Sequence, residues 1–323
     1  MSAVTNVDPG AVSVPGFAGD DYEVVVIGGG PAGLSAGLNL VRQRRRVLIL
    51  DSNRPRHSAT LVSHGFLTRD GVSPLELRGL GREEFSGYPT AEFHQGLVSS
   101  IAPRDDEGWF AISARGVRGS ADRSVRARVV LLASGLAETL PALPSIRAFY
   151  GTALHSCIEC DAFDKSAAPL ALLGDTADLH ERAVLISQVT DDLVVFTLGS
   201  DAVTSDEEAD LLDRGVRVER AAVSDVVGDR SGMTGVVLAD GTVVPRTGGF
   251  VRPHWSAPLE FAEALGLARD ADGFVQVDGV GRTSVPGVWA AGDITPPGPQ
   301  QLIVAAGAGA RTAAAVNRTL LAL

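Results

Sequence analysis

The stretch DYEVVVIGGGPAGLSAGLNLVRQRRRVLILD, from Asp21 to Asp51, decides the fold that we expect for this chain. Tyr22–Ile27 is an apolar, β-branched run typical of a buried parallel strand. A GxGxxG turn, apolar residues at helical spacing and a second buried strand at Val47–Leu50 follow, and that strand ends at an acid. This is the order that a dinucleotide-binding βαβ unit requires.

The glycine turn has the residue types that a bound pyrophosphate needs. Gly28 permits the tight turn, Gly30 lets the pyrophosphate approach the backbone, and Gly33 lets the helix pack closely on the strand. The helix N-terminus offers N–H groups and a positive dipole end, and Asp51 can accept hydrogen bonds from ribose hydroxyls. We therefore expect a dinucleotide site rather than a glycine turn without a ligand. Its expected residues are Gly28, Gly30, Pro31, Ala32, Gly33 and Asp51.

Composition and charge narrow the possible functions. The 323 residues are 45% hydrophobic and 21% charged, which is ordinary for a soluble globular protein with room for two domains. A net charge of −11 argues against binding to nucleic acid or to anionic membranes, since both require basic patches. No apolar run reaches the roughly 18–20 residues that span a bilayer. Residues 1–20 read as a flexible tail without the features of a signal peptide, so we expect a cytoplasmic protein.

The remaining chain continues the alternation of strands and helices. A strand at Val129–Ala133 ends at Ser134–Gly135, and Pro141 and Pro144 indicate a crossing into another domain. A second βαβ-type pattern then runs from Pro169 to about Gly248. Its expected elements include the strand PLALLG, a helix over Thr176–Gln188 and a hairpin that turns at Asp240–Gly241.

The end of the chain returns to the first domain. A buried strand at Val288–Ala291 stops at Gly292–Asp293, and a long helix rich in small residues follows. We expect an α/β fold with two Rossmann-like domains, the second inserted into the first. The expected boundaries are a tail at 1–20, the first domain at 21–144 and 249–323, and an inserted NAD(P)-binding-like domain at 145–248 that carries the cysteines.

Two cysteines, Cys157 and Cys160, are the only ones in the chain, and they lie in HSCIECDAF. A zinc site normally needs four protein ligands, or three with an open position, and His155 with both cysteines would leave the fourth unspecified. A redox pair fits better, because a CxxC can close a disulfide and its thiolate pKa can fall where a helix begins. Zinc binding and an inert pair remain alternatives, although we expect no metal.

Together these motifs resemble the low-molecular-weight thioredoxin reductase family of flavoproteins over nearly the whole chain after residue 20. The resemblance rests on VIGGGPAG, on CIECD, and on TSVPGVWAAGDI followed by QQL. It implies FAD as the cofactor of the two-part first domain, with Asp293 on the ribityl chain and Gln301 at the flavin ring. Other candidate cofactor-binding residues in these segments are Ser134, Gly135, Gly292 and Leu302.

The same resemblance assigns roles to the cysteine motif. Cys160 would lie nearer the flavin, Cys157 would exchange with substrate, and Asp161 would move a proton as thiol and thiolate interconvert. The alternative for Asp161 is a simple helix cap. Glu159, between the cysteines, departs from the small neutral residues of the reductases and should raise a thiol pKa, whereas a cationic His155 would lower it. Either residue can also be a solvated surface group.

The inserted domain lacks two parts of an NADPH site. In LALLGDTADL, Gly174 and Ala177 can stand for the second and third glycines, but the first position falls on Leu172, which would obstruct the turn. The next strand, DLVVFTLGSD, offers no Arg or Lys for a 2′-phosphate, and Asp201 would repel it. We therefore expect that NADPH does not bind in the usual way.

Electrons can then run from substrate to flavin. A dithiol substrate would reduce the cysteine disulfide, and FAD would pass the electrons to O2 and give peroxide. This resembles the FAD-dependent dithiol oxidases of disulfide natural-product pathways, and SHGFLTRDG is similar to that branch, which makes His64 a candidate for acid–base help or a structural loop residue. The alternatives are a reductase fed by NAD(P)H, ferredoxin or a flavin carrier, and a redox sensor. We also expect a homodimer, with the cysteines docked at the flavin.

Overall fold

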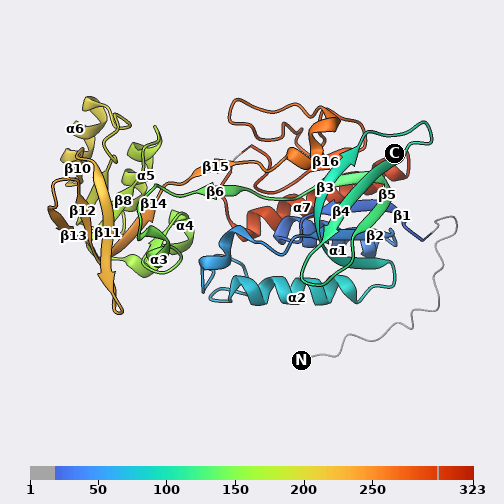
Figure 1. Ribbon diagram of the computed structural model, residues 1–323, viewed down its shortest axis with the longest axis horizontal. Coiled ribbons are helices and arrows are strands. Elements are labelled where there is room, and N and C mark those ends of the chain that lie inside the picture. Colours follow the sequence, from blue (N-terminus) through green and yellow to red (C-terminus); the bar gives the residue numbers. More distant parts are fainter. Residues whose placement is uncertain (1–18, 297) are drawn as a thin grey trace.

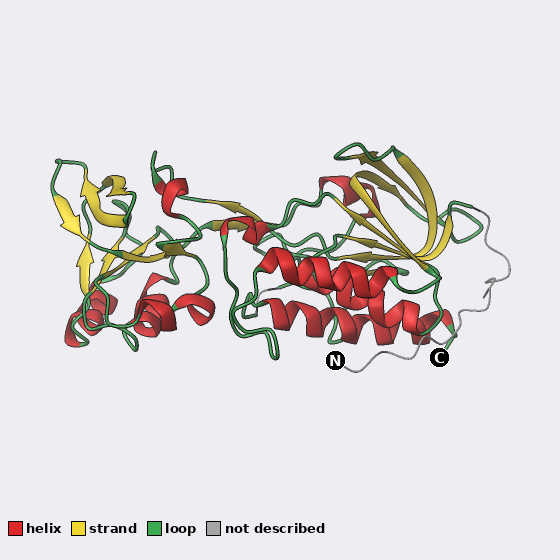
Figure 2. Ribbon diagram, turned by 90° about the horizontal axis from the view of Figure 1, so that it is seen from below, coloured by secondary structure: helices red, strands yellow, loops and turns green. Residues whose placement is uncertain are grey.

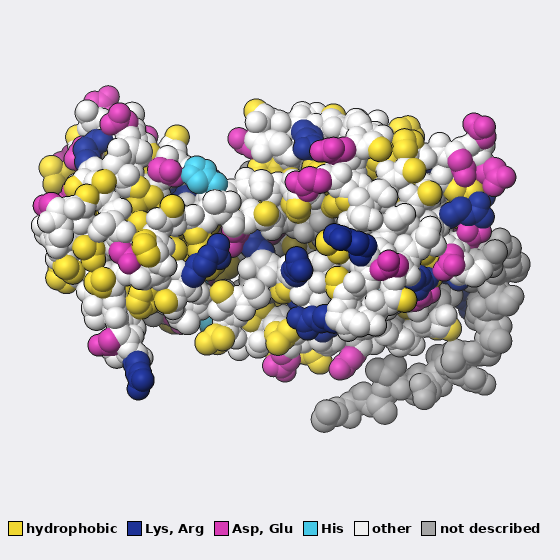
Figure 3. All heavy atoms as spheres, viewed as in Figure 1, with side chains coloured by type: hydrophobic (Ala, Val, Ile, Leu, Met, Phe, Trp, Pro, Cys, Tyr) yellow, Lys and Arg dark blue, Asp and Glu magenta, His cyan; other side chains and the backbone are white. Residues whose placement is uncertain are grey.

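The computed structural model describes residues 19–296 and 298–323, so the expected tail at 1–20 lies almost entirely outside the described residues. Figure 1 shows two lobes joined by a narrow ribbon of two antiparallel strands, β6 (Ala137–Thr139) and β15 (His254–Ser256). On the face in Figure 3 the surface is hollowed between the lobes, and basic and acidic side chains are interspersed over it. Among the described residues, no helix is long and apolar enough to cross a membrane.

The first lobe is built on one sheet of six strands. β5 pairs in parallel with β1 and β16, and β1 pairs in parallel with β2. β3 runs parallel to β2 in its first half and then turns antiparallel to β4, which returns to β5. The elements are β1 (Asp21–Ile27), α1 (Pro31–Arg42), β2 (Val47–Asp51), η1 (Arg56–Ala59), α2 (Pro74–Ser86), β3 (Ala91–Ala102), β4 (Phe110–Gly116), β5 (Arg123–Leu132), η3 (Glu260–Leu265), β16 (Val288–Ala290) and α7 (Leu302–Leu320).

Helices α1, α2 and α7 cover one face of this sheet (Figure 2). The apolar run of β1 alternates between the two faces: Val24 and Val26 pack under the helices, and Val25 packs into the core beneath β3–β5 and η3. Gly309 lets α7 lie directly on α1, because a side chain there would collide with the carbonyl oxygen of Ala32. The small residues of the last helix therefore serve close packing beside the glycine turn.

The second lobe contains a parallel sheet in the order β10-β9-β8-β14-β7 and a three-stranded antiparallel sheet, β11-β12-β13. The side chains of β8 point alternately toward helices α5 and α6 and toward the antiparallel sheet. The elements are α3 (Ile146–Phe149), β7 (Leu154–His155), α4 (Ile158–Asp161), η2 (Phe163–Lys165), β8 (Leu170–Leu173), α5 (Leu179–Ile186), β9 (Leu193–Phe196), α6 (Ser205–Asp213), β10 (Arg217–Glu219), β11 (Val223–Asp229), β12 (Gly232–Leu238), β13 (Val243–Pro245) and β14 (Gly248–Val251).

The expected α/β fold with two Rossmann-like units is confirmed, and two details differ. β14 pairs with β8 and β7, so residues 249–251 lie in the sheet of the inserted lobe rather than in the returning first domain. The chain crosses back only through β15. Helix α5 begins at Leu179 instead of Thr176, because the Thr176 hydroxyl donates to Asp178 at 2.6 Å and holds the preceding residues in a turn.

Candidate functional site

A cleft of about 880 Å³ opens at the carboxyl edge of the first sheet, where the turn after β1, the end of β2, the residues after β5 and the start of α7 meet. Its shape depends on glycine. Gly28 has φ +111°, and a side chain there would collide with the Ala133 carbonyl, whereas Gly30 faces open space. This volume and this cradle suit an extended dinucleotide.

Most of the predicted cofactor-binding residues line this cleft, although they are far apart in sequence. The lining includes Gly28, Gly30, Pro31, Ala32, Asp51, Ser134, Gly135, Asp293, Gln301 and Leu302. Gly33 and Gly292 lie just behind it, where they allow close packing against Gly28 and Ala32. The buried hydroxyl of Ser134 has no hydrogen-bond partner among the described residues, which fits a polar ligand in the cleft.

Two arginines that sequence reasoning missed hold the predicted acids of the cleft. Arg78 of α2 is buried, and it donates to Asp51 at 2.7 Å and to the carbonyl of Gly29 at 3.3 Å. Burial lowers the pKa of Arg78, although Asp51 opposes the shift. In the sequence, the sign of this role is that Arg78 lies on the same helical face of α2 as Pro74 and Phe85, which are buried. Arg78 therefore fixes the carboxylate at the ribose end of the cleft.

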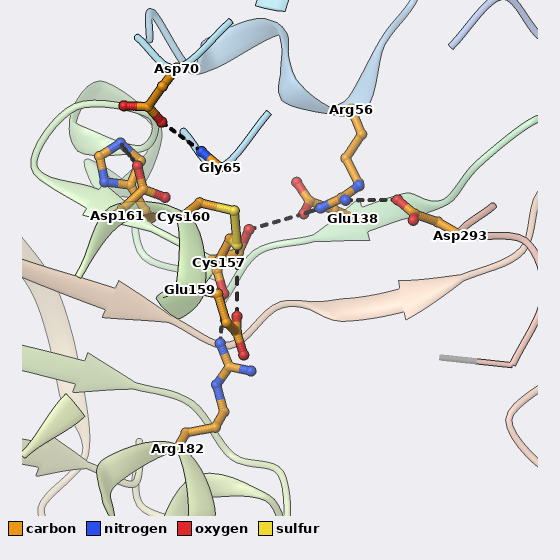
Figure 4. Close-up of a disulfide and its surroundings, with 12 residues drawn as sticks. Arg56, Gly65, Asp70, Glu138, Cys157, Glu159, Cys160, Asp161, Arg182 and Asp293 are labelled. Carbon is orange, nitrogen blue, oxygen red and sulfur yellow. Dashed lines mark hydrogen bonds and ion pairs between the residues drawn. A yellow bond between two sulfur atoms is a disulfide. The ribbon is translucent and has the colours of Figure 1, made fainter. Parts of the chain in front are cut away.

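The second missed arginine, Arg56, spans two carboxylates from different segments (Figure 4). It donates to Asp293 at 2.8 Å and to Glu138 of β6 at 2.9 Å. Burial alone would lower the pKa of Arg56, but the two carboxylates outweigh it and hold that pKa above its usual value. Glu138 also accepts from the Tyr150 hydroxyl at 2.8 Å, and Tyr150 bonds to Ser156 at 3.0 Å. A polar chain thus runs from the cleft to the residue before Cys157.

Cys157 and Cys160 form a disulfide at the start of α4. This is the oxidised state that the redox interpretation requires. The disulfide lines a small cavity of about 70 Å³, and this cavity shares Arg56, Glu138, Tyr150, Gln300 and Leu302 with the larger cleft. The sulfurs therefore lie next to the cleft, as a docked arrangement needs.

Asp161 and His155 lie behind the disulfide, 3.7 Å apart and both largely buried. Burial raises the pKa of Asp161 to about 6, against the opposing charges of Lys165 and His64. Burial and the charge of Lys165 lower the pKa of His155 to about 4. At neutral pH the carboxylate is therefore ionised but easily protonated, which suits a proton acceptor. A pKa this low leaves His155 neutral at pH 7, so the condition under which it would lower a thiol pKa, a cationic ring, is not met there.

Glu159 is exposed, and its Oε2 lies 3.8 Å from Sγ of Cys157. A disulfide sulfur carries no proton, so this is a contact and not a hydrogen bond. Arg182 lies on the other side of Glu159 (Figure 4) and donates to the Ser156 carbonyl at 2.6 Å. Burial lowers the pKa of Arg182, and Glu159 opposes that shift. Arg182 therefore offsets much of the negative field that Glu159 exerts on the sulfurs.

His64 lies on the rim of the disulfide cavity and connects the two lobes. Its Nε2 is 3.0 Å from Asp164 of η2, and its Nδ1 is 3.5 Å from Asp70 of its own loop. The structure thus brings His64 to the predicted pocket, with aspartates rather than a sulfur as its partners.

The corresponding turn of the inserted lobe is closed by the protein's own side chains. Leu172 is fully buried within β8, so the strand continues where the tight turn would begin. Beyond it, Asp178 binds Arg252 at 2.7 Å and Asp175 binds His254 at 2.9 Å. Two carboxylates therefore lie at the edge of the sheet where a pyrophosphate would need free N–H groups.

Comparison with known proteins agrees with this arrangement. The model of the pyridine nucleotide-disulphide oxidoreductase family matches residues 22–309. A protein of Arthroderma benhamiae named as a thioredoxin reductase is 28% identical over 298 residues, which cover 84% of this chain and 74% of its own length. The solved structure of TrxB from Bacillus anthracis, described as a thioredoxin reductase, is 32% identical with a TM-score of 0.86, covering 93% and 99% of the two chains. The structure of HlmI is 37% identical with a TM-score of 0.87, covering 95% of each chain.

Proposed function

The chain belongs to the pyridine nucleotide-disulphide oxidoreductase family as a thioredoxin reductase-like flavoprotein, and from this premise we propose that it is a dithiol oxidase. FAD is the cofactor of such proteins, and the glycine cradle, the free Ser134 hydroxyl and the carboxylates of Asp51 and Asp293 are residues that would hold it here. In this proposal a dithiol is converted to a disulfide and dioxygen is converted to hydrogen peroxide.

One observation carries the proposal: a competent cofactor cleft and a disulfide lie side by side, while the second nucleotide turn is closed. Buried Leu172 blocks the turn, and the Asp178–Arg252 pair fills the space beyond it. The segment that follows β9 adds Asp201 and, within residues 197–202, no Arg or Lys that could hold a 2′-phosphate. These features favour a substrate thiol over NADPH as the source of electrons.

The chain's own residues account for the exchange of sulfur bonds. A substrate thiolate attacks Sγ of Cys157, the Cys157–Cys160 bond breaks, and its electron pair remains on Cys160. The second substrate thiolate then attacks the mixed disulfide, releases Cys157 and closes the substrate disulfide. Asp161, with its pKa near 6, accepts a thiol proton and returns it to a cysteine sulfur. FAD in the cleft supplies a two-electron acceptor that dioxygen can reoxidise.

The test is an anaerobic titration of the purified flavoprotein with NADPH, NADH and a small dithiol such as dithiothreitol, followed by flavin absorbance. We expect the dithiol to bleach the flavin and air to restore it with about one peroxide per dithiol, whereas either nicotinamide nucleotide reacts slowly. If no dithiol bleaches the flavin, the proposal fails.

A disulfide reductase is the second candidate, because several relatives are named as thioredoxin reductases. A reductase would receive electrons from NAD(P)H in an unusual mode, or from ferredoxin or another flavin carrier, and would deliver them through the same cysteines. Rapid reduction of the flavin by NADPH alone in the titration above would favour this candidate.

We also propose that the protein acts as a homodimer, as thioredoxin reductase-like proteins do. Sedimentation velocity across a concentration series would test this, and a single monomeric species at micromolar concentration would contradict it.

A further inference from the structure

Within the part of the chain that the structure describes, the cavity at the disulfide offers no free cation to a substrate. Among the described residues that line it, Arg56 is the one arginine or lysine, and Glu138 and Asp293 both accept from it. The remaining charged groups of the lining are Glu138 and Asp161, together with His64 and the neutral His155. A carboxylate or phosphate on the substrate would therefore lose water here without gaining a partner, which is unfavourable.

Charges just outside the cavity continue this pattern. Asp70 and Asp164 flank His64, and Glu159 lies beside Cys157. Lys165 is largely buried, donates to the Thr152 carbonyl at 3.3 Å and interacts with Asp161 and Asp164. Arg69, in the exposed loop, donates to the carbonyl of Thr68 at 3.0 Å. Arg182, on the other side of Glu159, donates to the Ser156 carbonyl at 2.6 Å. Each of these cations therefore already has a partner within the protein.

Exposed apolar side chains lie on the segments that border the cavity. Seven of the twelve exposed large apolar side chains among the described residues lie on three segments that border it. Phe163 is 87% exposed and Leu67 is 80% exposed, although residues of these types are usually buried. The apolar collar consists of Leu61, Val62, Leu67, Leu75, Phe163, Ile303 and Val304.

Contacts among the described residues place the three segments around one opening. Val62, Pro74 and Leu302 line the cavity itself. The loop that carries Leu67 meets η2 through the His64–Asp164 pair, and Gly65 lies against the side chain of Gln301 at the start of α7. Both lobes therefore contribute to the collar, with the disulfide at its base.

We propose that this collar is the substrate-binding surface and that it selects neutral, apolar dithiols over dithiols that carry a negative charge. The inference rests on the proposed function and specifies its substrate class. The small cavity admits the two reacting sulfurs, and the collar covers the apolar body of the substrate. The sulfur chemistry is the exchange given above: two substrate S–H bonds are lost, one S–S bond forms, and the cysteines gain the electron pair and both protons.

The experiment compares dihydrolipoamide with dihydrolipoate, because the two share one dithiol and one carbon chain and differ in a single negative charge. Their rates of anaerobic flavin reduction are measured by stopped flow at pH 7.5. We expect the second-order rate constant of the amide to exceed that of the acid by about tenfold or more. Rate constants within twofold of each other would overturn the inference and leave the proposed function intact. If neither compound reduces the flavin, the proposed function itself fails.

Three variants test the collar directly. Leu67→Ser and Phe163→Ser should raise the dihydrolipoamide concentration at half-maximal rate by about five- to tenfold, because they remove apolar contact area. The matched control is Leu212→Ser in α6, which is 66% exposed and does not line the disulfide cavity. With this control, the dihydrolipoamide concentration at half-maximal rate should stay within twofold of that of the parent. Val62→Arg should favour dihydrolipoate and bring the ratio of the two rate constants toward one.

Two outcomes with these variants would overturn the inference. One is an equal effect of the collar variants and of Leu212→Ser. The other is a shift of the monomer–dimer balance by Leu67→Ser or Phe163→Ser without any change in flavin reduction, since that would make the collar a contact between two copies of the chain.

Discussion

The two lobes share a strand-turn-helix arrangement and differ in what the turn leaves open. In the first lobe β1 ends at Ile27, the chain turns at Gly28 with a φ of +111°, and α1 begins three residues later with Pro31. In the second lobe Leu172 keeps β8 straight, and α5 begins only at Leu179. The backbone of the first turn is exposed to a large cleft. The side chains of Asp178 and its neighbours occupy the space at the second turn.

The inserted lobe thus has the strand and the helix of a nucleotide site but lacks the tight glycine turn between them. A bound pyrophosphate needs backbone N–H groups that no side chain has already neutralised. At the second turn the side chains of Asp178 and Arg252 form an ion pair instead, and Cζ of Arg252 lies 3.9 Å from the centroid of the Trp255 ring. Under the proposed function, electrons then enter the protein by one route, the disulfide.

Removing the disulfide should break that route completely. Cys160→Ser should lower the rate of flavin reduction by dithiols by on the order of 10³-fold or more, because the electron pair has no sulfur to receive it. FAD content and melting temperature should stay close to those of the parent. Anaerobic stopped flow measures the rate, and dithiol reduction at the parental rate would mean that substrate reduces the flavin directly.

Alanine substitutions in the two glycine turns should affect FAD binding to very different extents. Gly28→Ala should weaken FAD binding by about 100-fold or more, because the new methyl group collides with the Ala133 carbonyl and φ is positive. Gly174→Ala meets the side chains of Arg252 and Leu179, which can shift, so the FAD affinity should remain within about twofold. Flavin release during gel filtration and titration of the apoprotein measure both values. Equal losses in the two variants would show that the second turn also serves FAD.

The proton acceptor should be visible as a pH dependence. Burial raises the pKa of Asp161 to about 6, so the carboxylate is protonated below that pH and active above it. The rate of disulfide exchange should therefore rise through pH 6, and Asp161→Asn should remove this limb and slow the reaction about 10- to 100-fold at pH 7.5. Since the folded state favours the protonated acid, its stability falls as pH rises through this range, and the asparagine variant should melt no lower than the parent at pH 7.5. An unchanged pH profile in the variant would assign the acceptor role elsewhere.

The smallest effect should come from breaking the ion pair at the second turn. Asp178→Asn releases Arg252 and should lower the free energy of unfolding by about 0.5–1 kcal/mol, because the pair is partly exposed. The NADPH affinity should change by less than about threefold, because Leu172 still blocks the turn. Thermal melting and fluorescence titration measure the two quantities. Tight NADPH binding by this variant would show that the ion pair alone closes the site.

Much of the fold could be predicted because its signals are local. The glycine turn, the two strands beside it and the late Gly292–Asp293 turn each depend on residues adjacent in sequence, and all lie at the cleft as expected. The block at Leu172 was also visible, since a β-branched or leucine-rich run predicts a continuing strand. Residues 249–251 were assigned to the wrong domain, because nothing local distinguishes a sheet's central strand from the next crossing.

Side-chain partners could not be predicted in the same way. Arg56, Arg78 and Arg182 reach carboxylates or carbonyls 26 to 237 residues away, and a chain rich in arginine gives no local reason to select them. The protonation of His155 depends on its burial, which the sequence HSC does not encode, so the sequence left open whether this ring is cationic. Such choices follow from the packed structure and not from spacing.

The ribbon between the lobes has an evolutionary consequence. Thr139 of β6 lies opposite His254 of β15, so everything from residue 140 to residue 253 enters and leaves through one pair of neighbouring strands. A segment whose ends meet can be exchanged or can lose a ligand without disturbing the host sheet, much as a plug-in module can be replaced. The disulfide lies within this inserted segment, whereas the flavin cleft lies at the edge of the host sheet. Changes confined to the insert can thus alter the source of electrons while the cofactor cleft keeps its shape.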